Sequence, residues 1–312
     1  MYIGGIDLGG TKTMVGITDE HGNILSSCTI DTNIADHRAH LTNCCQCLLQ
    51  CAQKLGIHIR QLTGLGVTVP GLADPRQGIL IKAVFAGWNQ IRIADFFKQL
   101  LEVDVFVEND VNACAIAELQ FGYKSRYQNF LWMTISTGVG GAVVCNGRLI
   151  RGVDGYAGEI GHVKVEFEHP YPCPCSELGC LEAHGSGTAI NRYVRELCLT
   201  DPDFLAELQT NGYSSDAVGC AALALQGNSA AQSVFNKAGT YLGKGISHYV
   251  NILNPEAIIL GGGVARSFSL LEKPIRDTMK QTVFRPLKHV DVVTTKLGYE
   301  AAFLGAAALV LS

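Results

Sequence analysis

Two parts of the chain alternate between apolar and polar residues and predict similar β-rich units. In the first part, the apolar runs YIGGIDLGG, KTMVGIT and ILSSCTI are separated by glycine and by the turn DEHGN. Glycine and asparagine at these positions are typical of tight turns, so the pattern predicts a three-stranded meander. Residues 36–55 then show helical spacing, and the run TGLGVTV, ended by Pro70 and Gly71, predicts another strand.

The second part of the chain repeats this scheme. The runs NFLWMTIS and GGAVVCNGRLIRG, with a hairpin turn at Asn146 and Gly147, are followed by helical segments and by the buried strand EAIIL. A chain of 312 residues exceeds the roughly 250 to 300 residues at which single cores stop growing. We therefore expect two α/β lobes around a ligand cleft: a small lobe of residues 1–109 plus about 299–312, and a larger one of residues 110–298.

Composition excludes several classes of partner. Apolar residues make up 47% of the chain, charged residues 17%, and the net charge is −4 without a basic cluster. This composition predicts a globular protein that binds neither nucleic acid nor an anionic membrane. The N-terminus resembles no signal peptide, and the apolar run at residues 301–312 is shorter than the roughly 20 residues that span a bilayer. We expect a cytoplasmic protein whose 12 cysteines are mostly reduced.

Three glycine-rich turns follow predicted strands. In DLGGTKT, Asp7 ends a strand and the first glycine turn (residues 9–12) follows, with Gly9, Gly10, Thr11 and Lys12. Its N–H groups can approach a phosphate while the carboxylate faces a metal ion, although a plain turn explains the same residues. STGVGG, the second glycine turn (residues 136–141), and LGGGVA, with Gly261 and Gly262, repeat the arrangement. Their order predicts the actin-like, hexokinase-type ATPase fold, which is ribonuclease H-like, rather than a Rossmann or Walker site.

Asp110 is the candidate general base. In VENDVNACAIAE a strand ends near Glu108, and a helix begins after Asn109 and Asp110. A carboxylate at such a helix start can accept a proton from a hydroxyl group during phosphoryl transfer. The alternative is that Asp110 is only the N-cap of this helix.

One histidine and three cysteines form a candidate metal site. His162, Cys173, Cys175 and Cys180 lie within twenty residues, and the cysteines have C-x-C-x4-C spacing. One imidazole and three thiolates make the closed set of a structural zinc site. A disulfide or simple packing of these cysteines remains the alternative. Because Glu159 and Glu182 flank the cluster, we expect the metal to shape a pocket rather than to perform the chemistry.

The sequence resembles the ROK family of bacterial sugar kinases and sugar-responsive repressors over nearly its whole length. The motifs that carry the resemblance occur in the family's order: GIDLGGTKT, VENDVNA, STGVGGAVV-NGRLIRG, GYAGEIGH, C-x-C-x4-C-L-E, SGTAI and NPEAIILGGG. The resemblance implies a hexose kinase that uses ATP and Mg²⁺, acts at the 6-hydroxyl and has a zinc site beside the sugar. It also implies a homodimer or homotetramer.

Site residues follow from the same motifs. By resemblance, Asp110 is the catalytic base, and the sugar ligands are Asn109, Glu159, His162, Glu182 and the backbone at Gly71. His162 would face both zinc and sugar. The residues expected around Mg-ATP are Asp7, Gly10, Thr11, Lys12, Thr137, Gly138 and Gly262, to which the glycine turns add Gly9 and Gly261.

The chain departs from the family pattern at two places. Ser176 stands where the family usually has glycine after the second cysteine, and Val84 and Phe85 precede Gly87 and Trp88, where many glucose-active members have an asparagine. A glucose-type hexose is the first expectation, and N-acetylmannosamine or another amino sugar or hexose is the alternative. A non-catalytic regulator is the third reading. The repressors carry an N-terminal helix-turn-helix, for which we expect no room before the strand at residue 2.

Overall fold

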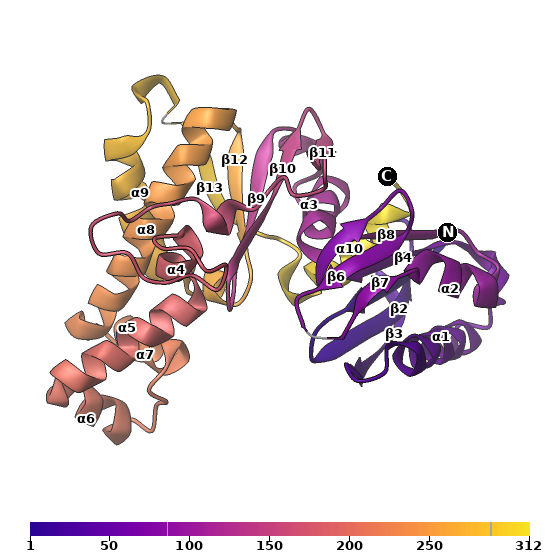
Figure 1. Ribbon diagram of the computed structural model, residues 1–312, viewed down its shortest axis with the longest axis horizontal. Coiled ribbons are helices and arrows are strands. Elements are labelled where there is room, and N and C mark those ends of the chain that lie inside the picture. Colours follow the sequence, from indigo (N-terminus) through magenta and orange to yellow (C-terminus); the bar gives the residue numbers. More distant parts are fainter. Residues whose placement is uncertain (86, 288) are drawn as a thin grey trace. The chain divides into compact units, whose positions relative to one another are not determined.

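A computed structural model describes residues 1–85, 87–287 and 289–312 (Figure 1). Its contacts divide the chain into two compact units. Unit 1 comprises residues 1–128, 143–157 and 295–312, and unit 2 comprises residues 129–142 and 158–294. This division differs from the predicted boundaries, which assign helix α3 (Asp110–Gln120) and residues 143–157 to the larger lobe. Helix α3 belongs to unit 1 because it packs against the C-terminal helix α10 (Ala301–Leu309).

Unit 1 contains a five-stranded sheet with the strand order β3-β2-β1-β4-β8. The strands are β1 (Tyr2–Leu8), β2 (Lys12–Thr18), β3 (Ile24–Asp31), β4 (Leu62–Val69) and β8 (Val105–Asn109). Strands β1, β2 and β3 form the predicted antiparallel meander, whereas β4 and β8 are parallel to β1. Parallel pairing brings the carboxyl ends of β1, β4 and β8 to one edge, where Asp7, Thr68 and Asn109 lie.

Helices cover both faces of this sheet. Helix α1 (His37–Lys54) packs on β2 and β3 and buries Leu41, Cys44 and Leu48 in the larger core. Cys51 is buried on the same face. Helix α10 packs on β1 and β4, and its Phe303 joins a second core with Ile116 of α3. Unit 1 also contains α2 (Ile93–Leu101) and a small sheet of β5 (Gly71–Asp74), β6 (Ile79–Ala83) and β7 (Asn89–Ile91).

The second sheet repeats the topology of the first, with the strand order β11-β10-β9-β12-β13. Its strands are β9 (Phe130–Ile135), β10 (Val139–Cys145), β11 (Arg148–Ile150), β12 (Ala257–Gly261) and β13 (Asp291–Thr294). Strand β12 runs parallel to β9 and to β13, while β10 and β11 form a hairpin. Asn146 and Gly147 turn this hairpin with φ values of 50° and 69°, as their sequence predicts.

Helices supply the remainder of unit 2. They are α4 (Leu181–Gly185), α5 (Gly187–Thr200), α6 (Pro202–Thr210), α7 (Ala217–Leu225), α8 (Ser229–Leu253) and α9 (Phe268–Thr282). The long helix α8 packs against α4, α5, α7 and α9 (Figure 1). In the part of the chain that the structure describes, no helix is long and apolar enough to cross a membrane.

Candidate active site

The first glycine turn joins β1 to β2 at the edge that carries Asp7. Gly10, Thr11 and Lys12 are exposed, and the Gly9 N–H donates to the Lys12 carbonyl at 3.1 Å. A Cβ atom at Gly9 would collide with that carbonyl, so glycine is required there. Asp7 accepts a hydrogen bond from the Thr68 hydroxyl at 2.7 Å. Burial raises the pKa of Asp7, and this hydrogen bond opposes the shift.

Asn109, and not Asp110, is the N-cap of α3. The Asn109 oxygen accepts from the N–H groups of Val111 and Asn112 at 2.9 and 3.0 Å. Its amide donates to the Gly71 carbonyl and to Asp110 Oδ1, both at 2.9 Å. Asp110 is therefore the first residue of the helix and is oriented by its neighbour. These contacts use the full hydrogen-bonding capacity of Asn109, so a sugar hydroxyl at this residue would have to share or replace one of them.

Two carboxylates influence each other at this edge of the first sheet. Burial, followed by the charge of Asp7, raises the pKa of Asp110 to about 7, and hydrogen bonds from Val111 and Asn109 limit the shift. A carboxyl group with a pKa near neutrality can accept a proton and release it again. A divalent cation at Asp7 would neutralise one of the two charges, so the acid pair also fits a magnesium ion.

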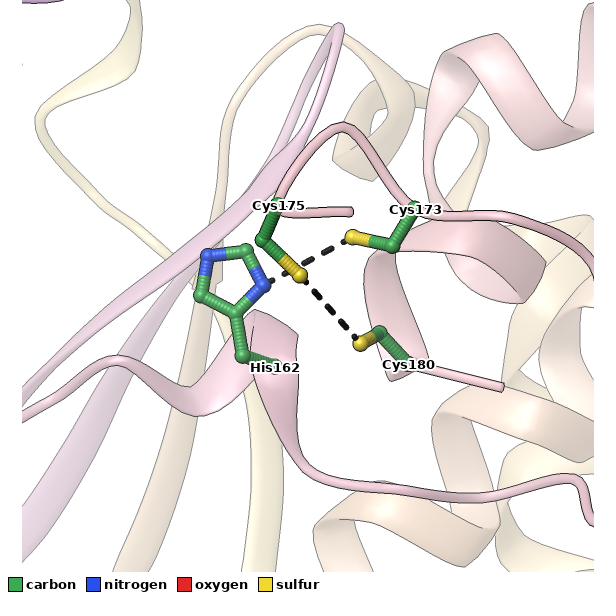
Figure 2. A group of neighbouring side chains, drawn as sticks. All are labelled: His162, Cys173, Cys175 and Cys180. Atoms are coloured by element: carbon green, nitrogen blue, oxygen red, sulfur yellow. Dashed lines mark hydrogen bonds between the residues drawn. The ribbon is translucent and has the colours of Figure 1, made fainter. Parts of the chain in front are cut away.

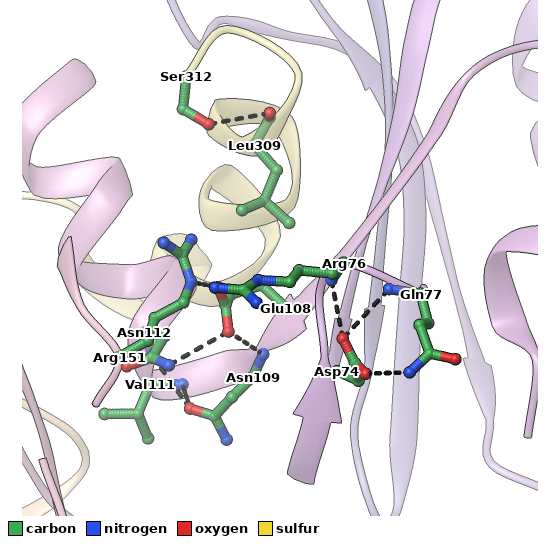
Figure 3. Close-up of polar contacts among 10 residues, drawn as sticks. All are labelled: Asp74, Arg76, Gln77, Glu108, Asn109, Val111, Asn112, Arg151, Leu309 and Ser312. Atoms are coloured by element: carbon green, nitrogen blue, oxygen red, sulfur yellow. Dashed lines mark hydrogen bonds and ion pairs between the residues drawn. The ribbon is translucent and has the colours of Figure 1, made fainter. Parts of the chain in front are cut away.

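A buried carboxylate supports the start of α3 and was missed by sequence reasoning. Glu108 is 2% exposed and accepts hydrogen bonds from the Asn109 N–H at 3.0 Å and from the Asn112 amide at 3.1 Å. Arg151 pairs with its second oxygen at 2.8 Å (Figure 3). Arg151 follows β11, so residues far apart in the sequence fix the Asn109–Asp110 pair. Only the adjacency of Glu108 to Asn109 hinted at this role.

Unit 2 brings the other two glycine-rich segments together. The second glycine turn begins after β9, and Gly261 is the last residue of β12 with Gly262 directly after it; β9 and β12 are parallel neighbours. Thr137 is exposed, and its carbonyl accepts a hydrogen bond from the Thr188 hydroxyl at 2.8 Å. Gly262 is exposed as well. Thr137, Gly138, Gly261 and Gly262 therefore belong to one edge of the second sheet.

The predicted metal ligands converge in unit 2. His162, Cys173, Cys175 and Cys180 offer one ligand atom each, and these atoms all lie within 4.8 Å of one another. His162 Nδ1 is 3.6 Å from Cys173 Sγ, and the Sγ atoms of Cys175 and Cys180 are 3.7 Å apart (Figure 2). These cysteines are thiols and not a disulfide. One nitrogen and three sulfur atoms are the donor set that a closed tetrahedral zinc ion takes.

Two glutamates connect this cluster with its surroundings. Glu182 Oε2 accepts from the Val139 N–H at 2.9 Å, and its Oε1 is 3.9 Å from Cys173 Sγ. A Cβ atom at Gly138 would collide with the same carboxylate, so the turn and the cluster share Glu182. Glu159 is exposed and lies 3.7 Å from His162 Nε2. The two ring nitrogens of His162 thus face different partners, the thiols on one side and Glu159 on the other.

The loop of residues 162–180 is held by an aromatic cluster that the sequence did not reveal. His184 is buried, and its Nε2 accepts from the Tyr171 N–H at 3.2 Å. Burial lowers the pKa of His184 to about 4, which keeps the ring neutral and able to accept this bond. Arg192 lies 3.6 Å from the centre of the Tyr171 ring. His184 is therefore a support of the loop and lies outside the group of His162, Cys173, Cys175 and Cys180.

Phe85, which with Val84 marks the departure from the family pattern, lies close to the first glycine turn. Phe85 packs edge-on against Trp88 with ring centroids 5.3 Å apart, and a Cβ atom at Gly10 would be 3.5 Å from the Phe85 ring. Val84 is 79% exposed. Apolar side chains thus stand in the segment where, by the family resemblance, many glucose-active members have an asparagine.

The duplicated strand order, the helices on both faces and the glycine turns at the strand ends define an α/β protein of the actin-like ATPase class. The model of the ROK family matches residues 3–312, and the chain belongs to this family.

Individual relatives agree with this assignment. A glucokinase of Thermotoga maritima is 31% identical over 310 residues, which cover 98% of this chain and 96% of that protein. The structure of a ROK family glucokinase from Streptomyces griseus in complex with glucose and AMPPNP is 29% identical, covers 99% of both chains and has a TM-score of 0.82. A xylose repressor of Bacillus spizizenii is 32% identical over 251 residues, 80% of this chain and 61% of the repressor.

Proposed function

We propose that this protein is an ATP-dependent sugar kinase that transfers the γ-phosphoryl group to the 6-hydroxyl of a glucose-type hexose. The observation that carries the proposal is the pair of Asn109 and Asp110. Asn109 orients a carboxyl group whose pKa is raised to about 7, at the edge of the sheet where the exposed first glycine turn begins. The glucokinases of Thermotoga maritima and Streptomyces griseus support it, since each matches nearly the whole chain.

In unit 1, Asp110 would act as the general base, with Asn109 and the Gly71 backbone beside the sugar. Asp7 would hold Mg²⁺, and Gly9, Gly10, Thr11 and Lys12 would surround the phosphates. ATP supplies the transferable phosphoryl group when bound. Asp110 would take the proton of the sugar hydroxyl as its oxygen bonds to the γ-phosphorus, while the bond from that phosphorus to the bridging oxygen breaks and ADP leaves. Lys12 together with the turn N–H groups would balance the negative charge of the phosphates.

In unit 2, Glu159, His162 and Glu182 would bind sugar hydroxyls. Their carboxylates and imidazole accept hydrogen bonds from hydroxyl groups, and Glu182 is fixed by the Val139 N–H. Thr137, Gly138, Gly261 and Gly262 would contact the nucleotide. Zinc held by His162, Cys173, Cys175 and Cys180 would fix the orientation of the His162 ring, leaving Nε2 for the sugar.

The identity of the sugar rests on the apolar segment before Trp88. Because the side chains of Val84 and Phe85 offer no hydrogen bond, an amino sugar such as N-acetylmannosamine, whose acetyl methyl group can pack on them, is the second candidate. A site built to bind a hydroxyl group rejects an analogue without it strongly, whereas an apolar wall discriminates weakly. We therefore expect activity on more than one hexose.

A non-catalytic, sugar-sensing regulator is the alternative from another class, because the xylose repressor of Bacillus spizizenii also matches this chain. The two proposals differ in whether Asp110 transfers a proton or only binds the sugar.

The deciding experiment measures ADP formation from MgATP with a panel of glucose, mannose, fructose, allose, N-acetylglucosamine and N-acetylmannosamine, and without sugar. Sugar-dependent turnover that disappears in Asp110→Asn supports the kinase. The position of the phosphate on the product, read by ³¹P and ¹³C NMR, tests the 6-hydroxyl. Sugar binding by calorimetry without any turnover would favour the regulator.

A further inference from the structure

A series of hydrogen bonds, buried at its start and partly buried at its end, connects helix α1 with the first glycine turn. His40 and Thr13 are both fully buried. His40 Nε2 lies 2.8 Å from Thr13 Oγ1, which lies 2.9 Å from Thr32 Oγ1. The Thr32 hydroxyl donates to the Gly9 carbonyl at 2.8 Å. The series therefore begins in a helix and ends at the peptide that opens the turn.

The direction of every bond in the series is fixed. The Asn33 N–H donates to His40 Nδ1 at 3.3 Å, so Nδ1 carries no proton and the neutral ring has its proton on Nε2. Nε2 then donates to Thr13. Because Thr32 gives its only hydroxyl proton to Gly9, it accepts from Thr13. The proton donors thus run one way from Asn33 through His40, Thr13 and Thr32.

The environment of His40 maintains this arrangement. Burial lowers the pKa of His40, which favours the neutral ring that accepts from Asn33. Trp88 packs on the ring with centroids 5.7 Å apart, and the Trp88 indole donates to the Ile34 carbonyl at 2.9 Å. Cys44 Sγ is 3.7 Å from Nε2, farther than the Thr13 oxygen, and burial raises the pKa of this thiol to about 12. Thr13 is therefore the main acceptor.

At the turn, Thr32 holds two carbonyl groups. Its hydroxyl donates to the Gly9 carbonyl, and its N–H donates to the Thr11 carbonyl at 2.9 Å. In a trans peptide the C=O and the following N–H point in opposite directions. Holding the Gly9 and Thr11 carbonyls toward Thr32 therefore directs the N–H groups of Gly10 and Lys12 away from it. Among the turn contacts of the described residues, the Lys12 N–H makes no return bond to Gly9.

We propose that His40 is a positioning residue for nucleotide phosphate, acting through Thr13 and Thr32 to keep the Gly10 and Lys12 N–H groups of the first glycine turn available to the phosphate oxygens. This inference rests on the proposed function, because it takes ATP as the ligand of the turn. It adds a residue that touches neither the nucleotide nor the sugar and that no sequence motif marked.

Replacing a threonine of the series by valine removes its hydroxyl group with little change in the shape of the side chain. Thr13→Val and Thr32→Val each delete one hydroxyl, and Thr13→Ser and Thr32→Ser restore it. Thr29→Val is the matched control, because Thr29 is an exposed threonine on strand β3, which ends directly before Thr32. His40→Gln retains an acceptor and a donor, whereas His40→Leu retains neither. The measurements are KM for ATP, KM for the sugar, and amide hydrogen exchange of residues 8–13 in ligand-free protein.

We expect Thr13→Val, Thr32→Val and His40→Leu to raise KM for ATP about fivefold or more, since each breaks a buried or partly buried hydrogen bond, and to change KM for the sugar less than about twofold. The serine variants and Thr29→Val should stay within about twofold of wild type. Thr13→Val combined with Thr32→Val should cost no more than the worse single variant, because both break one series. Amide exchange of residues 8–13 should become faster in both valine variants.

Unchanged amide exchange in the valine variants, or an equal rise in both KM values, would overturn the positioning role while leaving the kinase intact. A wild-type protein that binds no nucleotide would overturn the kinase proposal and this one together. The exchange measurement needs no ligand and no activity, so it decides the role of the series even if His40→Leu fails to fold.

Discussion

The side-chain amide of Asn109 donates a hydrogen bond to Asp110 Oδ1 at 2.9 Å, while the Asn109 oxygen caps helix α3 through Val111 and Asn112. A helix start normally uses one side chain to satisfy its free N–H groups. Because Asn109 has this task, the carboxyl group of Asp110 is held in position by the cap and remains available to a ligand. The same residue also binds the Gly71 carbonyl, which links the helix start to strand β5.

Replacing the proposed base should abolish transfer without abolishing sugar binding. We expect Asp110→Asn to lower kcat by about 10²- to 10⁴-fold, the range attributed to a positioned general base, while the Kd for the sugar changes little. Asn cannot take the proton but preserves the shape and the hydrogen bond to Asn109. Coupled turnover and calorimetry of the same preparations provide the test. Wild-type turnover by this variant would contradict the assignment.

The pH dependence of the reaction should reflect Asp110. Burial and the charge of Asp7 raise the pKa of Asp110 to about 7, so the carboxyl group is protonated below that pH and cannot act as a base. We expect kcat/KM for the sugar, measured at saturating MgATP, to rise with pH. A magnesium ion near Asp7 should move the midpoint below 7, because it offsets the negative charge. A flat profile between pH 5 and 8 would contradict this role.

The raised pKa of Asp110 should make the free energy of unfolding fall as pH rises, whereas the activity should increase with pH. Asp110 has an ordinary pKa of 3.8 when unfolded and about 7 when folded, so the folded protein holds the proton more tightly. The stabilisation from this proton is complete below the unfolded value and is lost as pH rises through about 7. Since Asn never ionises, Asp110→Asn should melt at a higher temperature than wild type at pH 8, with a smaller difference at pH 5. Thermal unfolding at both pH values tests this.

How much of the fold and of the candidate site could be predicted from the sequence depends on how far apart the interacting residues lie along the chain. Local signals located the meanders, the turn at Asn146 and Gly147, and the helix at residues 37–54. The four residues that converge in the candidate metal site could also be selected, because His162 and the cysteines lie in one short segment. The sequence allows Asp110 as the N-cap of α3, whereas the cap is Asn109, because the local pattern does not fix at which of two adjacent residues the helix begins. Arg151, the partner of Glu108, and His40, the partner of Thr13, lie 43 and 27 residues away along the chain, and local patterns do not reveal such pairs.

The cysteine cluster should bind zinc. Protein prepared without chelators should contain about one zinc ion per chain, and Cys175→Ser should lower this content and the melting temperature, because it removes one of four ligands. Cys145→Ser is the matched control, since Cys145 is an exposed thiol outside the cluster. Elemental analysis with thermal unfolding before and after chelation provides the measurement. Equal zinc contents in Cys175→Ser and wild type would exclude this ligand set.

Ser176 is strained in the loop that carries the cysteines. Its φ of 71° lies in the left-handed region, where a residue with a Cβ atom is less stable than glycine by roughly 1 kcal/mol. We expect Ser176→Gly to keep the zinc content and to bind zinc at least as tightly, while the β-branched Ser176→Val lowers the melting temperature. A competition titration with a chromogenic chelator measures the affinity. Weaker binding by Ser176→Gly would mean that the serine side chain itself supports the site.

The ion pair between Glu108 and Arg151 should stabilise the start of α3 more than an ion pair between two exposed side chains would. Arg151 is 43% exposed but Glu108 only 2%, so loss of the arginine leaves an almost fully buried carboxylate with only neutral donors. We expect Arg151→Leu to lower the free energy of unfolding by about 1 to 3 kcal/mol, since a buried charge loses its partner.

Adding Glu108→Gln to Arg151→Leu removes that charge and should recover part of the loss, because an amide at this position can still accept from the Asn109 N–H and from Asn112. Urea unfolding of wild type, both single variants and the double variant gives the interaction energy directly. If the two single losses simply add, Arg151 does not act through Glu108. If the double variant recovers stability but not turnover, the charge pair also sets the orientation of Asn109 and Asp110.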